Sequence, residues 1–414
     1  MKRIASLVLL ILVIVAVGAV SAAPKTQVKY STWRIEDRAV WDVLKASFEK
    51  ENPTIEIVFD FYTDNTVYYN TLTANAVAGT GLDVYDHHPN DQLYIKAASG
   101  YMADLSALPF VKNLPEDSKK LVTFDGKIIG YNAGINLICL IYNKEILDQN
   151  KIKPPKTFNE LVKAIKDLKA KGYGGIGYLG SDVKTDWLSD AMGCSIMGPA
   201  VYAKFKEAID QGQVTDARKY PGVLPVFQSL KAIAQNSLLY DNSVSTSYAA
   251  SLSLFAQKKT AFVMMGTWTF GTAQNDYPGI KFGIIPFPST VGSKFYAEPA
   301  QITCVFPGSK NLTAAKKWVE FLSRTDNAST YLNAVKWTPA LNGVKMNFEG
   351  ADMLIAAVKE GVAVKMPENT PNVQIWRMGL NQAYSDLLFD NADLDATLNA
   401  FNKFLAQVNP QLKK

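Results

Sequence analysis

Residues 124–172 read FDGKIIGYNAGINLICLIYNKEILDQNKIKPPKTFNELVKAIKDLKAKG, and this stretch decides the fold. Asp125-Gly126 lies between two apolar runs, a pattern that predicts a tight hairpin turn. The unbroken apolar run Leu137–Tyr142 predicts a strand that is buried on both faces. Pro154-Pro155 excludes a helix at that point and favours an extended segment.

A helix is predicted directly after this extended segment. Thr157 is the expected N-cap, and Glu160, three residues on, is expected to accept from the backbone amide of Thr157. The apolar residues that follow have helical spacing, and a glycine ends the pattern: Leu161, Ile165, Leu168 and Gly172. The stretch therefore reads as hairpin, buried strand and capped helix.

Three segments of this stretch resemble the central signature of the family 1 extracellular solute-binding proteins of ABC importers, the carbohydrate-binding, maltose-binding-protein-like group. They are YNKEIL at 142–147, KPPKTFNEL at 153–161 and KDLKAKG at 166–172. Further matches to the family order are FEKENPTIEIVF from residue 48, AGTGLDVY from 78, AASGYMADL from 97 and GIKFGIIPFP from 279. The resemblance thus covers nearly the whole mature chain.

The resemblance implies an α/β, two-lobed periplasmic-binding-protein fold, in which each lobe has a mixed, mainly parallel sheet flanked by helices and hinge crossovers join the lobes. It places residues 23–134 plus 302–342 in the first lobe and residues 135–301 plus 343–414 in the second. The sequence pattern at the start of the chain independently supports an α/β fold. The predicted strand 28–33, helix 38–50 and strand 55–61 suggest a βαβ unit and a parallel sheet.

The N-terminus has the pattern of a secretory signal peptide. Lys2-Arg3 precede the apolar run Ile4–Val20, and the small residues Ser21-Ala22-Ala23 follow. We expect residues 1–22 to be removed; the alternative is an uncleaved anchor, because the apolar run is long enough to span a bilayer. No cysteine lies near this site, so we expect no lipoprotein anchor and a location in the periplasm.

Charge and cysteine content exclude several classes of partner. The formal net charge is +5, with no run rich in Lys and Arg, which does not favour nucleic acid. The three cysteines, Cys139, Cys194 and Cys304, are too few for a disulfide framework and lie in apolar contexts, which predicts buried free thiols, although a Cys139–Cys304 bridge remains possible. We expect no cofactor and a monomer.

A sugar site needs flat aromatic faces for the C–H patches of the ring and polar groups for its hydroxyls. In open α/β sheets, ligands bind beyond the carboxyl ends of strands, so two facing lobes predict a site in the cleft between them. Residue type and position, together with the resemblance, give the candidate ligand-binding residues: Trp33, Arg34, Glu36, Asp64, Asp86, His87, His88, Asn132, Trp187, Trp268, Glu298 and Trp376. Trp268 is the strongest stacking candidate, and the maltose-binding relatives place a stacking aromatic at the position of Trp376.

Each candidate has a structural alternative. Asp64 also fits a helix cap, and core packing is the default for a tryptophan. Trp41 and Trp318 lie on amphipathic stripes and are assigned to cores, whereas Trp337 stays undecided. Adjacent histidines on a strand point in opposite directions, so His87 and His88 do not make a convincing metal site.

The predicted function is that of a periplasmic substrate-binding protein, not an enzyme, which closes on a sugar or oligosaccharide and docks on the membrane permease subunits. One alternative is a secreted glycoside-active enzyme, for which Glu36, Asp86 and Glu298 could supply the two carboxylates. The other is a metal- or iron-binding transport protein, supported only by the histidine pair. The sequence leaves the sugar, its length and its charge open, and a polyol also remains possible.

Overall fold

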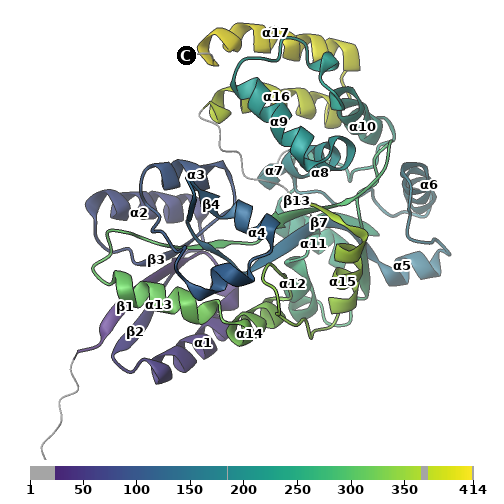
Figure 1. Cartoon of the computed structure of the whole chain (residues 1–414). Coiled ribbons are helices and arrows are strands. Elements are labelled where there is room, and N and C mark those ends of the chain that lie inside the picture. Colours follow the sequence, from purple (N-terminus) through teal and green to yellow (C-terminus); the bar gives the residue numbers. More distant parts are fainter. Residues whose placement is uncertain (1–23, 184, 365–371, 413–414) are drawn as a thin grey trace, which may run out of the picture.

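The chain forms two α/β lobes in the computed structural model, which describes residues 24–183, 185–364 and 372–412 (Figure 1). The predicted signal peptide, residues 1–22, lies outside the described residues. The strands are β1 (Thr26–Thr32), β2 (Ile55–Phe61), β3 (Val84–His87), β4 (Thr123–Phe124), β5 (Lys127–Ile128), β6 (Tyr131–Asn132), β7 (Gly134–Asn143), β8 (Phe262–Gly266), β9 (Phe282–Ile285), β10 (Phe295–Pro299), β11 (Ile302–Val305), β12 (Thr338–Pro339) and β13 (Val362–Val364).

Helices cover both sheets. The α-helices are α1 (Arg38–Glu51), α2 (Asn65–Ala78), α3 (Asp91–Ala98), α4 (Glu116–Leu121), α5 (Lys144–Gln149), α6 (Phe158–Lys169), α7 (Gly180–Val183), α8 (Asp186–Met197), α9 (Pro199–Asp210), α10 (Val223–Gln235), α11 (Tyr248–Ala256), α12 (Thr269–Asp276), α13 (Leu312–Leu322), α14 (Thr325–Val335), α15 (Ala351–Glu360), α16 (Val373–Leu388) and α17 (Leu394–Leu412). Short 3-10 helices are η1 (Ile35–Asp37), η2 (Pro109–Asn113), η3 (Ala217–Lys219) and η4 (Ser243–Ser245).

The first sheet has the strand order β2-β1-β3-β11-β6. β1 is parallel to β2 and to β3, as the βαβ pattern predicts, whereas β11 runs antiparallel to β3 and β6. Helices α1, α13 and α14 pack on this sheet, and the buried side chains of Trp41 and Trp318 lie in the core, as predicted.

The second sheet is centred on the long strand β7, which pairs with β8, β9, β10 and β12. All four of these pairs are antiparallel, and β10 with β13 is parallel. This differs from the mainly parallel sheet that we expected for the second lobe. The reason is the direction of the chain: β7 runs away from the first lobe, whereas β8 and β10 run back toward it.

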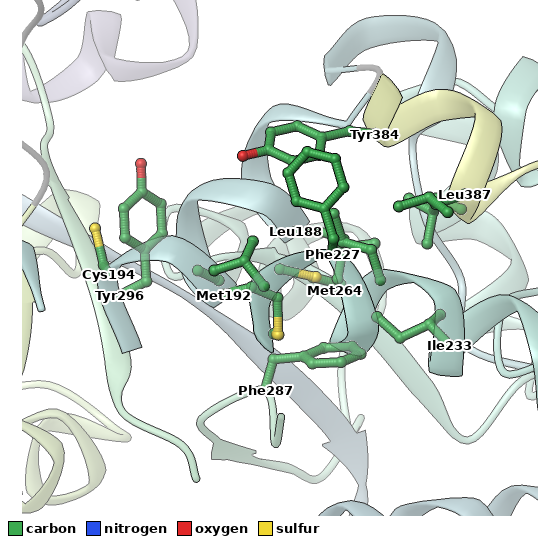
Figure 2. Close-up of a cluster of buried hydrophobic side chains, with 14 of the residues drawn as sticks. Leu188, Met192, Cys194, Phe227, Ile233, Met264, Phe287, Tyr296, Tyr384 and Leu387 are labelled. Carbon is green, nitrogen blue, oxygen red and sulfur yellow. The ribbon is translucent and has the colours of Figure 1, made fainter. Parts of the chain in front are cut away.

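Five helices gather on one side of the second sheet, where α8, α9, α10, α16 and α17 form the upper part of the molecule in Figure 1. Figure 2 shows the core beneath them, in which Leu188, Phe227 and Met264 meet side chains of α16. Phe227 and Tyr384 pack edge to face, with ring centroids 5.1 Å apart. This packing fixes the inner face of α16 on the second lobe.

Two links between the lobes are very short. β6 of the first sheet is joined to β7 of the second by Ala133 alone, and β10 is joined to β11 by Ala300-Gln301. Gly134 is packed so closely that a Cβ atom there would lie 2.8 Å from the carbonyl oxygen of Thr338. Thr338 pairs with β7, although Leu341 packs in the first core, so the predicted boundary near residue 342 stays a prediction.

The deciding stretch folds largely as its sequence indicates. Asp125 and Gly126 both have positive φ, 48° and 74°, and join β4 to β5. The Oγ1 atom of Thr157 accepts from the backbone N–H of Glu160 at 3.2 Å. One detail was wrong: Glu160 accepts from the N–H of Lys156, at 2.7 Å, rather than from that of Thr157. The reciprocal bond is therefore shifted by one residue.

Cys139, Cys194 and Cys304 are buried free thiols, as the apolar contexts predict. Burial raises the pKa of Cys304 well above its usual value. Among the helices of the described part of the chain, none combines the length and the apolar character needed to cross a membrane.

Candidate functional site

The strand ends of both lobes meet at the hinge. On the first sheet, the pairings of Ile302 with His87 and with Asn132 bring the carboxyl ends of β3 and β6 to the start of β11. On the second sheet, Gly266 at the end of β8 lies opposite Ile138 near the start of β7. Residues that follow these strand ends therefore lie near the interface of the two lobes.

Trp33 and His88 form a stacked pair on the first lobe. Trp33 follows β1 and His88 follows β3, two neighbouring parallel strands. Their ring centroids are 3.8 Å apart and the planes differ by 12°. Tyr68 meets the edge of the Trp33 ring at 5.5 Å. Both members of the pair are half-buried, so the stack offers a partly exposed flat surface.

His88 is held by Tyr69 of α2. The Tyr69 hydroxyl accepts from the backbone N–H of His88 at 3.0 Å and lies 2.7 Å from Nδ1 of the same residue. The direction of the hydrogen bond between the hydroxyl and Nδ1 follows from the tautomer of the ring. Burial, together with the charges of His87 and Arg34, lowers the pKa of His88 to about 3.

Arg34 is neutralised within its own loop. Its Nε and Nη2 donate to the two carboxylate oxygens of Asp37 at 2.8 and 3.0 Å, and Nη1 lies 2.7 Å from Glu36. The guanidinium also lies 4.7 Å from the centre of the Trp337 ring. Burial would lower the pKa of Arg34, but the neighbouring carboxylates raise it above its usual value. The group is thus a fixed, compensated cation, and the Glu36 side chain is half exposed beside it.

Asp86 and His87 lie inside the sheet rather than on its surface. The Asp86 carboxylate accepts from Tyr30 at 2.9 Å and from Thr303 at 2.8 Å. Burial raises the pKa of Asp86 to about 6, against the opposing effect of these hydrogen bonds. His87 is fully buried, and its Nδ1 lies 2.7 Å from the carbonyl oxygen of His88. Both side chains support the strand end, and their contact with a ligand stays a prediction.

Three other candidates have different surroundings. Asp64 caps α2 by accepting from the N–H of Val67 at 2.8 Å, which is the alternative interpretation of this residue. Asn132 is fully buried at the hinge, and neither its amide nitrogen nor its amide oxygen has a hydrogen-bond partner among the described residues. Glu298 is half-buried on β10, opposite Asn136. Asn132 therefore has unused hydrogen-bonding capacity at the crossover.

Trp268 is the central aromatic residue of the second lobe's edge. It follows β8 and opens α12, is half-buried, and packs against the hydrophobic cores of both lobes. Gly266 makes room for it, because a Cβ atom there would lie 1.7 Å from the indole ring. Trp187 of α8 meets its ring edge to face, with centroids 5.2 Å apart. Two aromatic rings thus lie together where the lobes meet.

Tyr248 adds a third ring to this side. Burial raises the pKa of its hydroxyl, whereas hydrogen bonding by Thr269 and Trp268 and the charge of Arg34 act in the opposite direction. Arg34 belongs to the first lobe, so the groups that surround Tyr248 come from both lobes. The Asp182 carboxylate accepts from the backbone N–H of Tyr248 at 2.7 Å and holds the start of α11 in place.

Trp376 does not join these rings. Only 1% of it is exposed, and its indole N–H donates to Asp210 of α9 at 2.8 Å within the core of the second lobe. A ligand has no exposed indole face to stack on there, so the predicted stacking role is not supported. The ring points into the core of the second lobe.

The sequence analysis missed Tyr69 and Tyr248 and left Trp337 undecided. Tyr69 and Tyr248 lie on helices, not at strand ends, so the rule that selected Trp33 and Trp268 could not select them. Trp337 follows a positive-φ residue, Lys336, and its ring is buried beneath Arg34. The sequence near Trp337 gives no local indication of its contact with Arg34, which lies about three hundred residues earlier in the chain.

The described residues contain no group of three or more His, Cys, Asp or Glu side chains that could hold a metal ion. What they offer at the interface is aromatic surface from both lobes with amide, carboxylate and phenol groups around it. This combination suits a ligand with apolar faces and many hydroxyl groups.

Comparison with known proteins gives consistent matches over most of the chain. Residues 44–364 match the family model described as bacterial extracellular solute-binding protein. The melibiose/raffinose/stachyose-binding protein MelE of Bacillus subtilis is 28% identical over 79% of this chain and 77% of its own length. The apo form of RafE from Streptococcus pneumoniae superimposes with a TM-score of 0.72 at 19% identity, covering 95% of this chain and 99% of that one. A sugar transporter from Bacillus licheniformis in complex with stachyose has a TM-score of 0.66 at 18% identity, covering 91% and 98%.

Proposed function

Because the chain belongs to the bacterial extracellular solute-binding protein family, we propose that it is the substrate-binding protein of an ABC importer and captures a sugar or oligosaccharide between its lobes. The observation that carries this proposal is the position of Trp268, which packs against the cores of both lobes with Trp187 and Tyr248 beside it. A ligand stacked there touches both lobes at once.

The chemistry of the surrounding groups supports a carbohydrate. The Trp33–His88 stack and the Trp268–Trp187 pair supply apolar faces from opposite lobes. The half-exposed Glu36 carboxylate beside Arg34 offers acceptors to hydroxyl groups. The relatives named for melibiose, raffinose and stachyose point the same way.

Closure would follow from contacts to both lobes. A ligand that binds the closed arrangement more tightly than the open one shifts the population toward closure. The single-residue link at Ala133 and the two-residue link at Ala300-Gln301 are where backbone rotation would be absorbed. In this proposal the closed form docks on the membrane permease subunits from the periplasm, as a monomer and without catalysing a reaction.

The experiment is a thermal-shift screen of the mature protein followed by calorimetry. The probes are melibiose, raffinose and stachyose, with monosaccharides, polyols, acidic sugars and divalent metals beside them. A ligand that binds only the folded state raises the melting temperature. We expect a shift with one sugar class, and we expect Trp268→Ala to weaken that binding by about 1–3 kcal/mol.

Two results would contradict the proposal. A metal response that a chelator abolishes, with no response to any sugar, would favour metal transport. Release of new reducing ends from an oligosaccharide would show catalysis. A Trp268→Ala variant that binds with wild-type affinity would remove this residue from the site, and Trp41→Phe, a substitution in the first core, serves as the matched aromatic control.

A further inference from the structure

A cavity lies on the second lobe, between α16, α17 and the short helices α7 and η4, with a volume of about 960 Å³. This volume is at the upper end of the range found for small-molecule sites, about 300–1,000 Å³. No residue of the predicted sugar site lines it. Its lining includes small residues of both helices, Gly379 and Ala383 of α16 and Ala400 of α17.

The two helices give the cavity two different walls. On α16, Arg377, Asn381 and Ser385 recur every fourth residue and therefore share one face of the helix. On α17, Phe401 and Phe404 are three residues apart and also share a face, although Phe401 is almost fully buried. The α16 wall thus carries amide, hydroxyl and guanidinium groups beside the exposed Met378, and the α17 wall carries the Phe404 ring and Thr397.

The charged groups on the walls are balanced. Asp386 and Arg377 supply one carboxylate and one guanidinium, and the Gln382 amide donates to Asp386 at 2.6 Å. This solvent-accessible pair offers hydrogen-bonding groups to sugar hydroxyls, and aromatic rings pack on the C–H faces of a sugar. The lining therefore favours a neutral saccharide over a charged or purely apolar ligand.

The cavity is connected to the proposed sugar site through the short helices α7 and η4. Gly180, Ser181 and Val244 form its third wall, and the Ser181 hydroxyl donates to the carbonyl oxygen of Thr246 at 3.1 Å. The next residue, Asp182, accepts from the backbone N–H of Tyr248, and Tyr248 is the ring that lies beside Trp268. The segments around α7 and η4 thus contribute both to the cavity and to the proposed sugar site.

We propose that this cavity is a second carbohydrate-binding site, which holds sugar units in addition to those at Trp268. This inference rests on the proposed function, because it names further binding surface for the same class of ligand. The sugar units come either from the far end of the oligosaccharide bound between the lobes or from a separate saccharide molecule. The two sources differ in stoichiometry and in their dependence on chain length.

Gly379→Ala is a direct probe of the cavity. A Cβ atom at Gly379 would lie 2.2 Å from the ring of Phe404, so this ring of the cavity lining must move. The backbone of Gly379 is helical, and alanine is favourable there. The double variant Asn381→Ala/Gln382→Ala tests the polar wall without adding volume, and Lys403→Ala, on the exposed side of α17, is the matched control.

The measurement is isothermal titration of melibiose, raffinose and stachyose into the full mature chain and these variants, after circular dichroism has shown that each is folded. If the far units of one oligosaccharide occupy the cavity, both cavity variants lose about fivefold to tenfold in affinity for stachyose and keep that for melibiose. If a separate molecule occupies it, the wild type shows a second binding event that persists in Trp268→Ala and disappears in the cavity variants.

Two negative results have different meanings. If the wild type binds stachyose through Trp268 and the cavity variants bind all three sugars as the wild type does, with no second event, this inference is overturned and the proposed function stands. If the wild type binds none of the sugars, in calorimetry or in the thermal-shift screen, the proposed function fails and the inference fails with it.

Discussion

The indole ring of Trp33 lies flat on the imidazole ring of His88, 3.8 Å away, and the two rings come from the ends of neighbouring parallel strands. Because Tyr69 fixes the imidazole from behind, the stack is a preformed surface. Rigid aromatic surfaces bind with little loss of conformational entropy. The first lobe therefore has an aromatic platform that matches the Trp268–Trp187 pair of the second.

We predict that Trp33→Ala weakens sugar binding by about 1–3 kcal/mol, measured by calorimetry with the sugar that the screen identifies. His88→Phe keeps a flat ring beneath Trp33 and should retain most of the affinity, whereas His88→Ala should not. Equal affinity in Trp33→Ala and the wild type would place the ligand elsewhere.

Trp376→Phe should separate stability from binding. The substitution keeps the ring volume roughly but leaves the Asp210 carboxylate without the indole N–H. We expect the free energy of unfolding to fall by about 1–3 kcal/mol, and the sugar affinity of the folded protein to stay unchanged. Denaturant unfolding and calorimetry on the same sample test both statements. A loss of affinity without a loss of stability would restore Trp376 to the site.

Asp86 should make the fold less stable as the pH rises. Its pKa in the folded protein is about 6, above the value of about 3.9 in an unfolded chain. The folded state therefore binds the proton more tightly, so this group stabilises the fold fully below about pH 4, and the contribution is lost as the pH rises through 6. A shift of this size corresponds to about 2–3 kcal/mol.

Asp86→Asn removes this titration. Between pH 4 and pH 7, the unfolding free energy of the wild type should fall by about 2–3 kcal/mol relative to that of the variant. Urea unfolding at each pH gives the difference, in which the other titrating groups cancel. Parallel pH profiles for the two proteins would show that the carboxyl does not titrate in this range.

The buried pair Lys206–Asp190 should be sensitive to the loss of one partner. The Lys206 Nζ atom lies 2.9 Å from Asp190 Oδ1, and both side chains are less than a tenth exposed. Lys206→Met leaves the carboxylate without its cation and should cost about 3–5 kcal/mol, most of which Lys206→Met/Asp190→Leu should restore. The exposed pair Lys163–Asp167 is the control, with an expected cost below about 1 kcal/mol for Lys163→Met.

The sequence predicted what local chemistry determines. Asp125-Gly126 needed positive φ and Thr157 needed a partner amide, and both requirements are met within a few residues. The apolar run before Tyr142 indicated burial on both faces, although distant segments provide the cover. The choice of Trp33 and Trp268, which follow strands, could also be made from the sequence, because ligands bind beyond the carboxyl ends of strands in open α/β sheets.

The sequence did not predict which polar strand-end residues would turn inward. Asp86 and His88 are two residues apart at one strand end, yet Asp86 is buried by Tyr30 and Thr303 while His88 is half exposed against Trp33. That choice depends on contacts with strand β11, far along the chain. The orientation of Trp376 also depends on a distant residue. Its indole N–H donates to Asp210 of α9, which holds the ring in the core.

The short crossovers have a consequence for how the protein is made. β11 lies between β3 and β6 in the first sheet, yet the chain passes through β7 to β10 before it reaches β11. During synthesis the first lobe cannot complete its sheet until most of the second lobe has emerged, and such distant pairings form slowly.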